Sequence, residues 1–378
     1  MRIVVANFIA DPVLGGGTAM KSVTLARALA SAGVGAHLIT TNLGLSDNSS
    51  VDVGGANITV VPAVFPRFPI PWVRRGELAA GIKGADAVIL LNHWNILNAR
   101  VFLAARRVNV PVMLCPAGAL RIQGRSRWLK EVYQALIGQR MIDQADALIA
   151  TTPVEEAEFR AAGISPARIH VIPNGIDTEP EGMTGDEFRT RHGLGSAPLV
   201  LFMGRLNSIK GPDLLLEAFV TLKDRLPTWH LVIAGRDEGL ERSLRARAGH
   251  AGLAARVHFV GHLDPAASTG AYRSASLLVV PSRHEAMSLV ALEAAVNGTP
   301  VLLTDVCGFS GVEESGGGRV VAATVSAISR GLEKMLADPN LPVMGARLRE
   351  YVVAKFGWGT VVQQYIQLVT WSRSDNRS

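Results

Sequence analysis

The feature that most limits the possible folds of this chain is a regular alternation between short apolar runs and helical patterns. Twelve runs fit buried strands, and segments with apolar residues at helical spacing lie between them. The runs are Ile3–Ile9, Ala36–Thr41, Ile58–Pro62, Ala87–Asn92, Pro111–Pro116, Ala147–Thr151, Ile169–Pro173, Leu199–Arg205, His230–Gly235, Val257–Gly261, Leu277–Pro281 and Pro300–Thr304. This alternation predicts an α/β protein with parallel sheets that helices cover on both faces.

The length of the chain, 378 residues, favours two domains over one. The alternation begins again at Leu199, after a segment at 174–198 that is rich in Gly, Pro and acidic residues. We interpret part of that segment as a linker and expect one doubly wound domain at 1–180 and another at 181–357. Folds of this kind bind ligands beyond the carboxyl ends of their strands, so we expect a ligand cleft between the two domains.

Several classes of protein are disfavoured by composition. Apolar residues make up 48% of the chain, but no run reaches the roughly 18 residues of a membrane-spanning helix. The first residues, MRIVVANFIADP, lack the basic flank and long apolar core of a signal peptide, so we expect a strand there. Cys115 and Cys307 fit reduced thiols better than a disulfide framework. We therefore expect a cytoplasmic protein.

The stretch Pro281–Ala295, PSRHEAMSLVALEAA, carries two glutamates that a single ligand could bridge. Ser288 fits a helix N-cap, which places Glu285 in the preceding loop and Glu293 within the helix. At about 1.5 Å per residue the carboxylates lie roughly 10–12 Å apart, too far to act on one bond. They could instead hold two ends of a hydroxyl-rich ligand, with phosphate at the helix start between them. A nucleotide sugar has this layout; two solvated glutamates are the alternative.

Two cations follow the predicted strand at 199–205. Arg205 ends that strand and Lys210 lies five residues later. Such a pair could neutralise a diphosphate and stabilise it as a leaving group. A solvated basic loop is the alternative, although Gly204 beside Arg205 would allow a ligand to come close.

The first predicted strand is followed by Gly15, Gly16, Gly17 and Thr18, ahead of an Ala-rich helix expected at 19–32. Glycines at a helix start let backbone N–H groups approach an anion, while a flexible turn is the alternative. Met20 stands where the dinucleotide-binding fingerprint has its third Gly, and no acidic residue ends the second strand. Both observations argue against a nicotinamide-dependent dehydrogenase.

His93 follows the predicted strand Ala87–Asn92, at the end that faces the ligand in a doubly wound fold. A histidine there can donate hydrogen bonds or titrate near neutral pH. A purely structural histidine is the alternative.

Taken together, these segments resemble the retaining glycosyltransferases of the GT-B fold, specifically family 4 (group 1). The resemblance runs over nearly the whole chain, and its last two segments together are highly specific. It is carried by the glycine loop at 15–18, by NHW at 92–94, by Val171–Asp177, by Phe202–Phe219 and by Pro281–Asp305.

The resemblance implies a role for each candidate site residue. Arg205 and Lys210 would hold the donor diphosphate, Glu285 the donor sugar, and Glu293 the nucleotide ribose. His93 would lie on the sugar and acceptor side, and the glycine loop would meet phosphate or acceptor. The implied catalytic residues are Glu285, His93, Arg205 and Lys210, and the implied donor-binding set adds Ala286, Met287, Ser288, Leu289 and Glu293.

The chain also departs from the family pattern at two places. Ala286, Met287 and Ser288 replace the usual Gly-Phe-Gly, so phosphate-binding N–H groups come from a backbone with less freedom. Ala117-Gly118 stands where many relatives have Arg-Gly, which puts an acceptor contact by that arginine in doubt. Neither departure removes a proposed catalytic group.

The implied activity is transfer of a sugar, with retention of configuration, from a UDP- or GDP-linked donor to a glycan or lipid-linked saccharide. Synthesis of cell-surface polysaccharide, such as lipopolysaccharide, is the expected setting. The resemblance makes 1–180 the acceptor side and 181–357 the donor side, with a helix in 358–378 that packs back on the first domain. No cofactor is expected because the nucleotide sugar is a substrate, and the absence of an Asp-x-Asp motif gives no support for a metal. A non-catalytic nucleotide-sugar-binding protein, an epimerase or a phosphorylase on the same fold remain alternatives, although no lysine is marked for pyridoxal phosphate.

Positive charge is concentrated between residues 65 and 140. That region holds twelve Lys and Arg against three Asp and Glu, a net charge of +9, so the rest of the chain carries −3 of the total of +6. Cations alternate with large apolar residues at Phe65–Arg75 and Arg121–Arg140, where Trp128, Leu129, Val132, Leu136 and Ile137 can share a helix face. We therefore expect peripheral binding to an anionic membrane on its cytoplasmic side, with a packed helix as the alternative, and no nucleic-acid partner.

Overall fold

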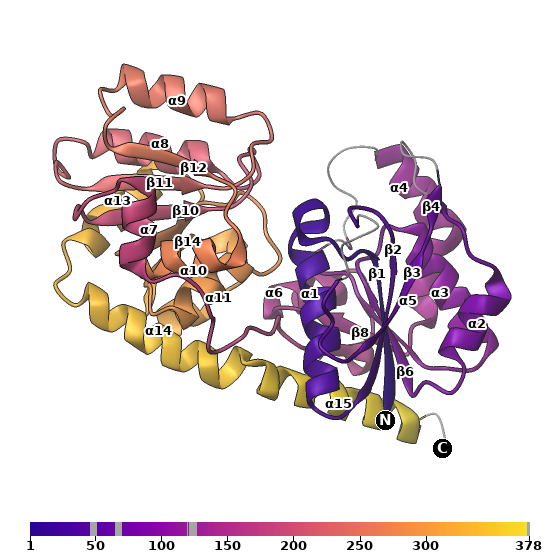
Figure 1. The fold of residues 1–378 in the computed structure, drawn as a ribbon. Helices are drawn as coiled ribbons and strands as arrows, with labels where there is room; N and C mark the ends of the chain where they lie inside the picture. Colours follow the sequence, from indigo (N-terminus) through magenta and orange to yellow (C-terminus); the bar gives the residue numbers. More distant parts are fainter. Residues whose placement is uncertain (46–50, 65–69, 119, 121–126, 376–378) are drawn as a thin grey trace. The chain divides into compact units, whose positions relative to one another are not determined.

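The computed structural model describes residues 1–45, 51–64, 70–118, 120 and 127–375 (Figure 1). The chain forms two compact units. The first is Met1–Gly175 together with Trp358–Ser378, and the second is Ile176–Gly357. Each unit has its own parallel sheet, with helices on both faces.

The first unit contains a seven-stranded parallel sheet in the order β3-β2-β1-β6-β7-β8-β9. Its strands are β1 (Arg2–Ile9), β2 (Gly35–Thr41), β3 (Asn57–Val61), β6 (Ala87–Leu91), β7 (Val112–Cys115), β8 (Ala147–Ala150) and β9 (Ile169–Val171). All seven predicted runs of the first half are therefore confirmed as strands. The short antiparallel pair β4 (Ala63–Val64) and β5 (Ile70–Pro71) was not predicted. The strand order reverses between β1 and β6, where doubly wound folds bind ligands.

Helices cover both faces of this sheet. They are α1 (Pro12–Ser31), α2 (Arg75–Ile82), α3 (Ile96–Arg107), α4 (Arg127–Tyr133), α5 (Gln139–Gln144), α6 (Pro153–Ala161) and α15 (Trp358–Asp375). A π-helix, η1 (Gln134–Gly138), joins α4 to α5, and a 3-10 helix, η2 (Pro166–Arg168), precedes β9. One core contains Phe102 of α3, and the other contains Leu25 of α1 with Tyr365 of α15. The C-terminal helix thus packs in the first unit.

The glycine segment differs from the expected loop. Helix α1 begins at Pro12, because Asp11 caps it by accepting a hydrogen bond from Leu14 N at 2.6 Å and proline suits the first helical position. Gly16 then interrupts the helix with φ 61° and ψ −145°. Gly15–Thr18 therefore lie at a kink inside α1, and the prediction that the helix starts at residue 19 is wrong.

The second unit contains a six-stranded parallel sheet in the order β12-β11-β10-β13-β14-β15. Its strands are β10 (Leu199–Met203), β11 (His230–Ala234), β12 (Val257–Gly261), β13 (Leu277–Val280), β14 (Val301–Thr304) and β15 (Gly318–Val321). All five predicted runs of the second half are confirmed, while β15 was not predicted. The order reverses between β10 and β13.

The helices of the second unit again lie on both faces of its sheet. They are α7 (Gly185–His192), α8 (Pro212–Thr221), α9 (Glu241–His250), α10 (Pro265–Ser274), α11 (Leu289–Val296), α12 (Gly311–Glu314), α13 (Val325–Leu336) and α14 (Leu341–Phe356), with a 3-10 helix, η3 (Asp305–Cys307). Every residue of β13 is buried, because helices cover both faces of a parallel sheet.

The expectations about membrane-spanning helices and about the two cysteines can be compared with the described part of the chain. None of the helices there is long and apolar enough to cross a membrane. Cys115 and Cys307 are both buried and form no disulfide, in agreement with the expected free thiols.

Candidate functional site

The loops that follow β10 and β13 bring two predicted site residues together in the second unit. Lys210 belongs to the loop between β10 and α8, and Glu285 to the loop between β13 and α11. These are the two strands at which the strand order reverses. Ligands of doubly wound sheets bind beyond the carboxyl ends of such strands, so the position favours a binding site.

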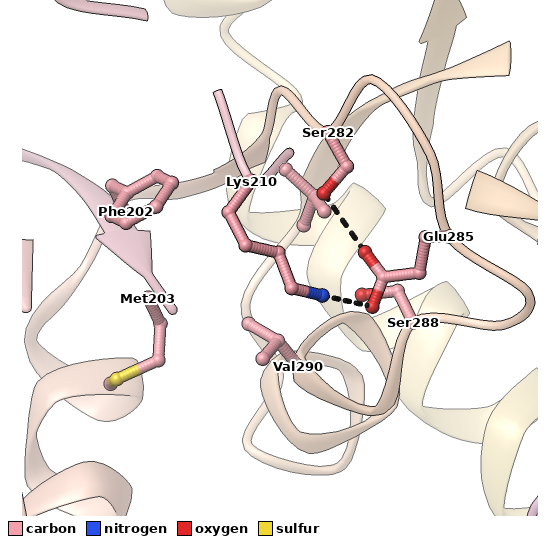
Figure 2. Close-up of a pocket in the computed structure, with 8 residues that line it drawn as sticks. Phe202, Met203, Lys210, Ser282, Glu285, Ser288 and Val290 are labelled. Carbon is pink, nitrogen blue, oxygen red and sulfur yellow. Dashed lines mark hydrogen bonds and ion pairs between the residues drawn. The ribbon is translucent and has the colours of Figure 1, made fainter. Parts of the chain in front are cut away.

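Lys210 and Glu285 form a largely buried ion pair (Figure 2). Lys210 Nζ lies 2.8 Å from Glu285 Oε1, and the two side chains are only 23% and 12% exposed. Ser282 Oγ donates to the other carboxylate oxygen, Oε2, at 2.9 Å. The pair lines a small pocket together with Phe202, Met203, Val280, Ser282, Ser288 and Val290. In the free protein, the proposed diphosphate-binding cation therefore neutralises the proposed sugar-binding carboxylate.

The two loops can approach so closely because Gly211 has no side chain. It has φ 69°, in the left-handed region, and a Cβ there would overlap the carbonyl oxygen of Pro281. A backbone hydrogen bond from Arg283 N to Ile209 O, 2.7 Å long, joins the loops on either side of the ion pair. The backbone thus holds Lys210 beside Glu285.

Arg205 also has a carboxylate partner. Its Nη1 atom donates to Glu238 at 3.1 Å and 3.3 Å, and Asn207 Nδ2 donates to the same carboxylate at 2.6 Å. Asn207 in turn accepts a hydrogen bond from the backbone N–H of Lys210 at 3.0 Å, so Glu238 and Asn207 together link Arg205 to the backbone of the Lys210 loop. The hydrogen bond from Asn207, aided by Arg205, lowers the pKa of Glu238. Arg205 is half-exposed and does not line the pocket of Lys210.

The start of α11 confirms the predicted N-cap. Ser288 is fully buried, and its side chain accepts a hydrogen bond from Ala291 N at 3.3 Å. The preceding residues Ala286 and Met287 form the turn into the helix, and Leu289 is its first residue. Because N–H groups of a first helical turn have no partner within the helix, this end of α11 is suited to an anion beside Lys210.

Glu293 lies in the second turn of α11 and contacts a tyrosine from α10. Tyr272 Oη donates to Glu293 Oε2 at 2.6 Å, and the tyrosine ring is buried. Burial raises the pKa of Glu293, and the hydrogen bond from Tyr272 opposes part of that rise. Tyr272 thus binds one of the two carboxylate oxygens of Glu293, Oε2.

The remaining predicted residues belong to the first unit. His93 follows β6 and the kink at Gly15–Thr18 follows β1, so both lie beyond the two strands at which that sheet reverses. The side chain of His93 has no exposed surface. Its Nε2 atom lies 3.0 Å from Gln134 Oε1, and the rings of Trp94 and Tyr133 contact it edge-on. Burial lowers the pKa of His93, which favours a neutral ring.

Sequence reasoning missed the residues that hold the predicted ones in place. Ser282 directly follows the β13 run Leu277–Pro281, and a hydroxyl at a strand end was an available signal. Tyr272 and Glu238 are 21 and 33 residues from their partners, and no spacing rule joins them.

The described residues contain no group of three or more His, Cys, Asp or Glu side chains that could hold a metal ion. The polar groups of this site are instead the two cations Arg205 and Lys210, the two carboxylates Glu285 and Glu293, and the start of α11. Such a set suits a ligand with a diphosphate and several hydroxyl groups.

Comparisons with known proteins agree with this description. The family model "Glycosyl transferases group 1" matches residues 185–351, and the model "Glycosyl transferase 4-like domain" matches residues 16–175. A D-inositol 3-phosphate glycosyltransferase of Xylanimonas cellulosilytica is 30% identical over 378 aligned positions, which cover 91% of this chain and 88% of that protein. Its namesake from Gordonia bronchialis is 37% identical over 243 positions, which cover 59% of this chain and about half, 52%, of that relative. The crystal structure of HepE from Anabaena in complex with UDP and glucose matches 98% of this chain and 99% of its own, with a TM-score of 0.78 and 17% identity.

Proposed function

Because the chain belongs to the group 1, family 4-like glycosyltransferases of the GT-B fold, we propose that it transfers a sugar with retention of configuration from a UDP- or GDP-linked donor. The proposed acceptor is a glycan or a lipid-linked saccharide, in the synthesis of cell-surface polysaccharide. The observation that carries this proposal is the Lys210–Glu285 pair beyond the switch strands of the second unit, with Glu293 further along α11.

The proposed donor site divides between three groups of the second unit. Lys210, Arg205 and the first N–H groups of α11 bind the diphosphate and stabilise it as it departs. Glu285 accepts hydrogen bonds from sugar hydroxyls, and Glu293 accepts them from the ribose. To do so, Lys210 must exchange the carboxylate of Glu285 for phosphate oxygens, which frees that carboxylate for the sugar.

In the retaining mechanism that we propose, positive charge develops on the sugar carbon as the bond to phosphate breaks. The departing diphosphate accepts the proton of the acceptor hydroxyl, so no separate base is required. His93 orients the sugar or the acceptor. Since its ring has no exposed surface, direct contact requires movement of a neighbouring side chain, and the rings of Trp94 and Tyr133 are among its neighbours.

A ligand screen followed by two activity assays tests this function. Thermal shifts with UDP, GDP and their sugars identify the donor, because a ligand at 100 times its Kd adds about 2.7 kcal/mol of stability. UDP-glucose is the first choice, since HepE was solved with UDP and glucose. Release of nucleotide and formation of glycoside are then measured separately. Binding without either reaction indicates a non-catalytic binding protein, and interconversion of the donor sugar without transfer indicates an epimerase.

The acceptor is tested with a panel of compounds. Lipid-linked saccharides and soluble glycans represent the proposed class, and D-inositol 3-phosphate is included because it appears in the names of the curated relatives. Transfer to D-inositol 3-phosphate alone would contradict the proposed acceptor class while leaving the donor chemistry intact. The anomeric configuration of the product, measured by NMR, tests retention.

We also propose that the first unit binds an anionic membrane surface. Trp128, Leu129, Val132 and Leu136 are 66%, 38%, 48% and 77% exposed on α4 and η1. Ile137 instead packs against the core, so the predicted face of five residues is wrong for that position. Trp72, in the segment that follows β5, is also exposed. Apolar residues on a basic helix are typical of segments that lie in a membrane interface.

The structure limits which cations can contribute to membrane binding. Arg100 donates to the carbonyl oxygens of Pro71 and Val73, and Arg106 pairs with Asp146. Arg67, Arg121 and Arg125 lie outside the described residues. The proposal therefore rests on the exposed apolar side chains of α4 and η1 and on the net charge of the region.

Sedimentation with vesicles tests membrane binding. Each basic residue near an anionic surface contributes about 1 kcal/mol, and salt screens the attraction. We expect binding to anionic vesicles that weakens with added salt and with the combined change of Arg125, Arg127 and Lys130 to Glu. A matched control changes Arg191, Arg319 and Arg330 of the second unit to Glu. Equal, salt-independent partitioning to neutral and anionic vesicles would contradict the proposal.

A further inference from the structure

A chain of hydrogen-bonded side chains connects the buried His93 to the surface of the first unit. Gln134 Oε1 lies 3.0 Å from His93 Nε2, and Gln134 Nε2 donates to Gln139 Oε1 at 2.9 Å. Gln139 Nε2 then donates to Asp143 Oδ1 at 2.9 Å. His93 has no exposed surface, whereas Gln139 and Asp143 are exposed. We call Gln134, Gln139 and Asp143 the amide relay.

The π-helix η1 aligns the two glutamines of the relay. A π-helix joins backbone groups five residues apart by hydrogen bonds, and the N–H of Gln139 bonds to the carbonyl oxygen of Gln134 across η1, which brings these two residues close together. In an α-helix, residues three or four apart are neighbours, as Gln139 and Asp143 are on α5. A single π-turn is rare and frequently marks a functional site. The irregular turn thus brings onto one line two side chains that a continuous α-helix would separate.

Gly138, the last residue of η1, leaves space for the contact with His93. A Cβ there would lie 2.5 Å from Gln134 Oε1 and 3.0 Å from His93 Nε2. The first distance is too short for a carbon and an oxygen atom that are not covalently bonded. A side chain at Gly138 would therefore push Gln134 away from the imidazole.

The direction of every hydrogen bond in the relay follows from its outer end. A carboxylate only accepts hydrogen bonds, so Gln139 must turn its NH₂ group toward Asp143. The carbonyl oxygen of Gln139 then faces the NH₂ group of Gln134, which leaves the carbonyl oxygen of Gln134 facing His93. Nε2 of His93 must consequently carry the proton, and Nδ1 has a free lone pair. Within the described part of the chain, Nδ1 is buried and has no hydrogen-bond partner.

We propose that Gln134, Gln139 and Asp143 are positioning residues for glycosyl transfer, because they hold His93 in the tautomer with its proton on Nε2. This leaves Nδ1 as the atom that accepts a hydrogen bond from a substrate hydroxyl. The inference rests on the proposed function of His93. A side chain beside the imidazole, such as Trp94 or Tyr133, must move to admit that hydroxyl, and the relay holds the ring at its Nε2 edge while this happens.

The tautomer of His93 can be measured directly. Full-length protein labelled with ¹⁵N at histidine gives ring-nitrogen signals that distinguish the two neutral tautomers, and His93→Gln identifies the signals of His93. Asp143→Asn lets the outer group donate as well as accept, and Gln134→Met removes the acceptor at Nε2. We expect one tautomer, with the proton on Nε2, in the wild type and a mixture of tautomers in both variants. Glu156→Gln, which removes a surface carboxylate paired with Arg160 on α6, is the charge-matched control and should retain the wild-type signals.

The kinetic test separates positioning from general stability. We expect Asp143→Asn and Gln134→Met to lower kcat about 10-fold, equivalent to about 1.4 kcal/mol, while the KM for the donor stays unchanged. Gln134→Glu should instead keep the wild-type kcat, because the introduced carboxylate also accepts a hydrogen bond from His93 Nε2. A wild-type proton on Nδ1, or a single unchanged tautomer in both variants, would overturn the relay. Full activity of His93→Gln would instead overturn the proposed function of His93, and the tautomer measurement would still decide whether the relay exists.

Discussion

The ion pair between Lys210 and Glu285 allows stability and catalysis to be separated by mutation. At the 2.8 Å separation of Nζ and Oε1, Coulomb attraction is about 6 kcal/mol for an effective dielectric constant near 20. Desolvation of both groups offsets most of that attraction. Removing one partner of a fully buried pair costs about 3–5 kcal/mol, but these side chains keep 23% and 12% exposure. We therefore expect the loss of one partner to cost about 2 kcal/mol.

The test compares Lys210→Met, Glu285→Gln and the double mutant with the wild type. Lys210→Met keeps the aliphatic chain and leaves Glu285 with the hydroxyl of Ser282 as its donor. A loss of about 2 kcal/mol lowers the Tm of a unit of this size by roughly 4–8 °C. The double mutant contains no unpaired charge, so it should regain most of that Tm. Arg247→Met, which breaks the half-exposed pair with Glu217, should change the Tm much less.

Transfer activity should respond differently from stability. Lys210→Met should slow transfer at saturating donor by roughly 30- to 1,000-fold, because the departing diphosphate loses a charge partner. The double mutant should not regain this activity, although it regains stability. Additive changes in Tm would show that the two side chains are not coupled in the free protein. An unchanged rate of Lys210→Met at saturating donor would remove Lys210 from the proposed mechanism.

Three further predictions concern the same unit. Nucleotide affinity, measured by calorimetry, should fall with decreasing pH as Glu293 gains a proton at its raised pKa. Tyr272→Phe should move that fall to higher pH, because the hydrogen bond that lowers the pKa of Glu293 is lost, and Glu293→Gln should abolish the pH dependence. Glu293→Ala should weaken binding of bare UDP or GDP, whereas Glu285→Ala should leave that binding intact or strengthen it, since Lys210 is released; equal losses in both would contradict the division of roles. Gly211→Ala should lower both the Tm and donor affinity, because a Cβ at φ 69° overlaps the carbonyl oxygen of Pro281 and costs at least about 2 kcal/mol. An unchanged Tm would refute the close approach of the two loops.

Most strands of the two sheets could be predicted because their sequences are largely apolar. The runs that became β6 and β13 consist of buried aliphatic residues, and a helical surface pattern does not fit them. Strand β15, Gly-Arg-Val-Val, lies at the edge of its sheet and is only partly buried, so its sequence has no such signature. The start of α1 was missed for a different reason. The glycines at 15–17 outweighed the Asp11-Pro12 pair, which is a strong helix-start signal.

The positions of the proposed site residues in the fold could be predicted, but their contacts could not. Spacing placed Glu285 before a helix and Glu293 within it, and the capping hydrogen bond at Ser288 confirms that helix start. Spacing could not show that Glu285 pairs with Lys210, 75 residues away, because the pair depends on two strands becoming neighbours. The π-turn at Gln134–Gly138 was equally hidden. Its hydrogen bonds differ from those of an α-helix by one residue, and side-chain pattern does not report that shift.

Each proposed donor-binding group has a protein partner in this structure: Lys210 has Glu285, Arg205 has Glu238, and Glu293 has Tyr272. A ligand must therefore exchange these contacts rather than fill vacant ones. A diphosphate can do so, because its oxygens replace both carboxylates at the two cations and leave those carboxylates free for hydroxyl groups. A free sugar has no charge to offer Lys210, and a nucleoside without phosphate meets Glu293 alone. The proposed donor carries sugar, diphosphate and ribose in one molecule, so it can replace all of these contacts at once.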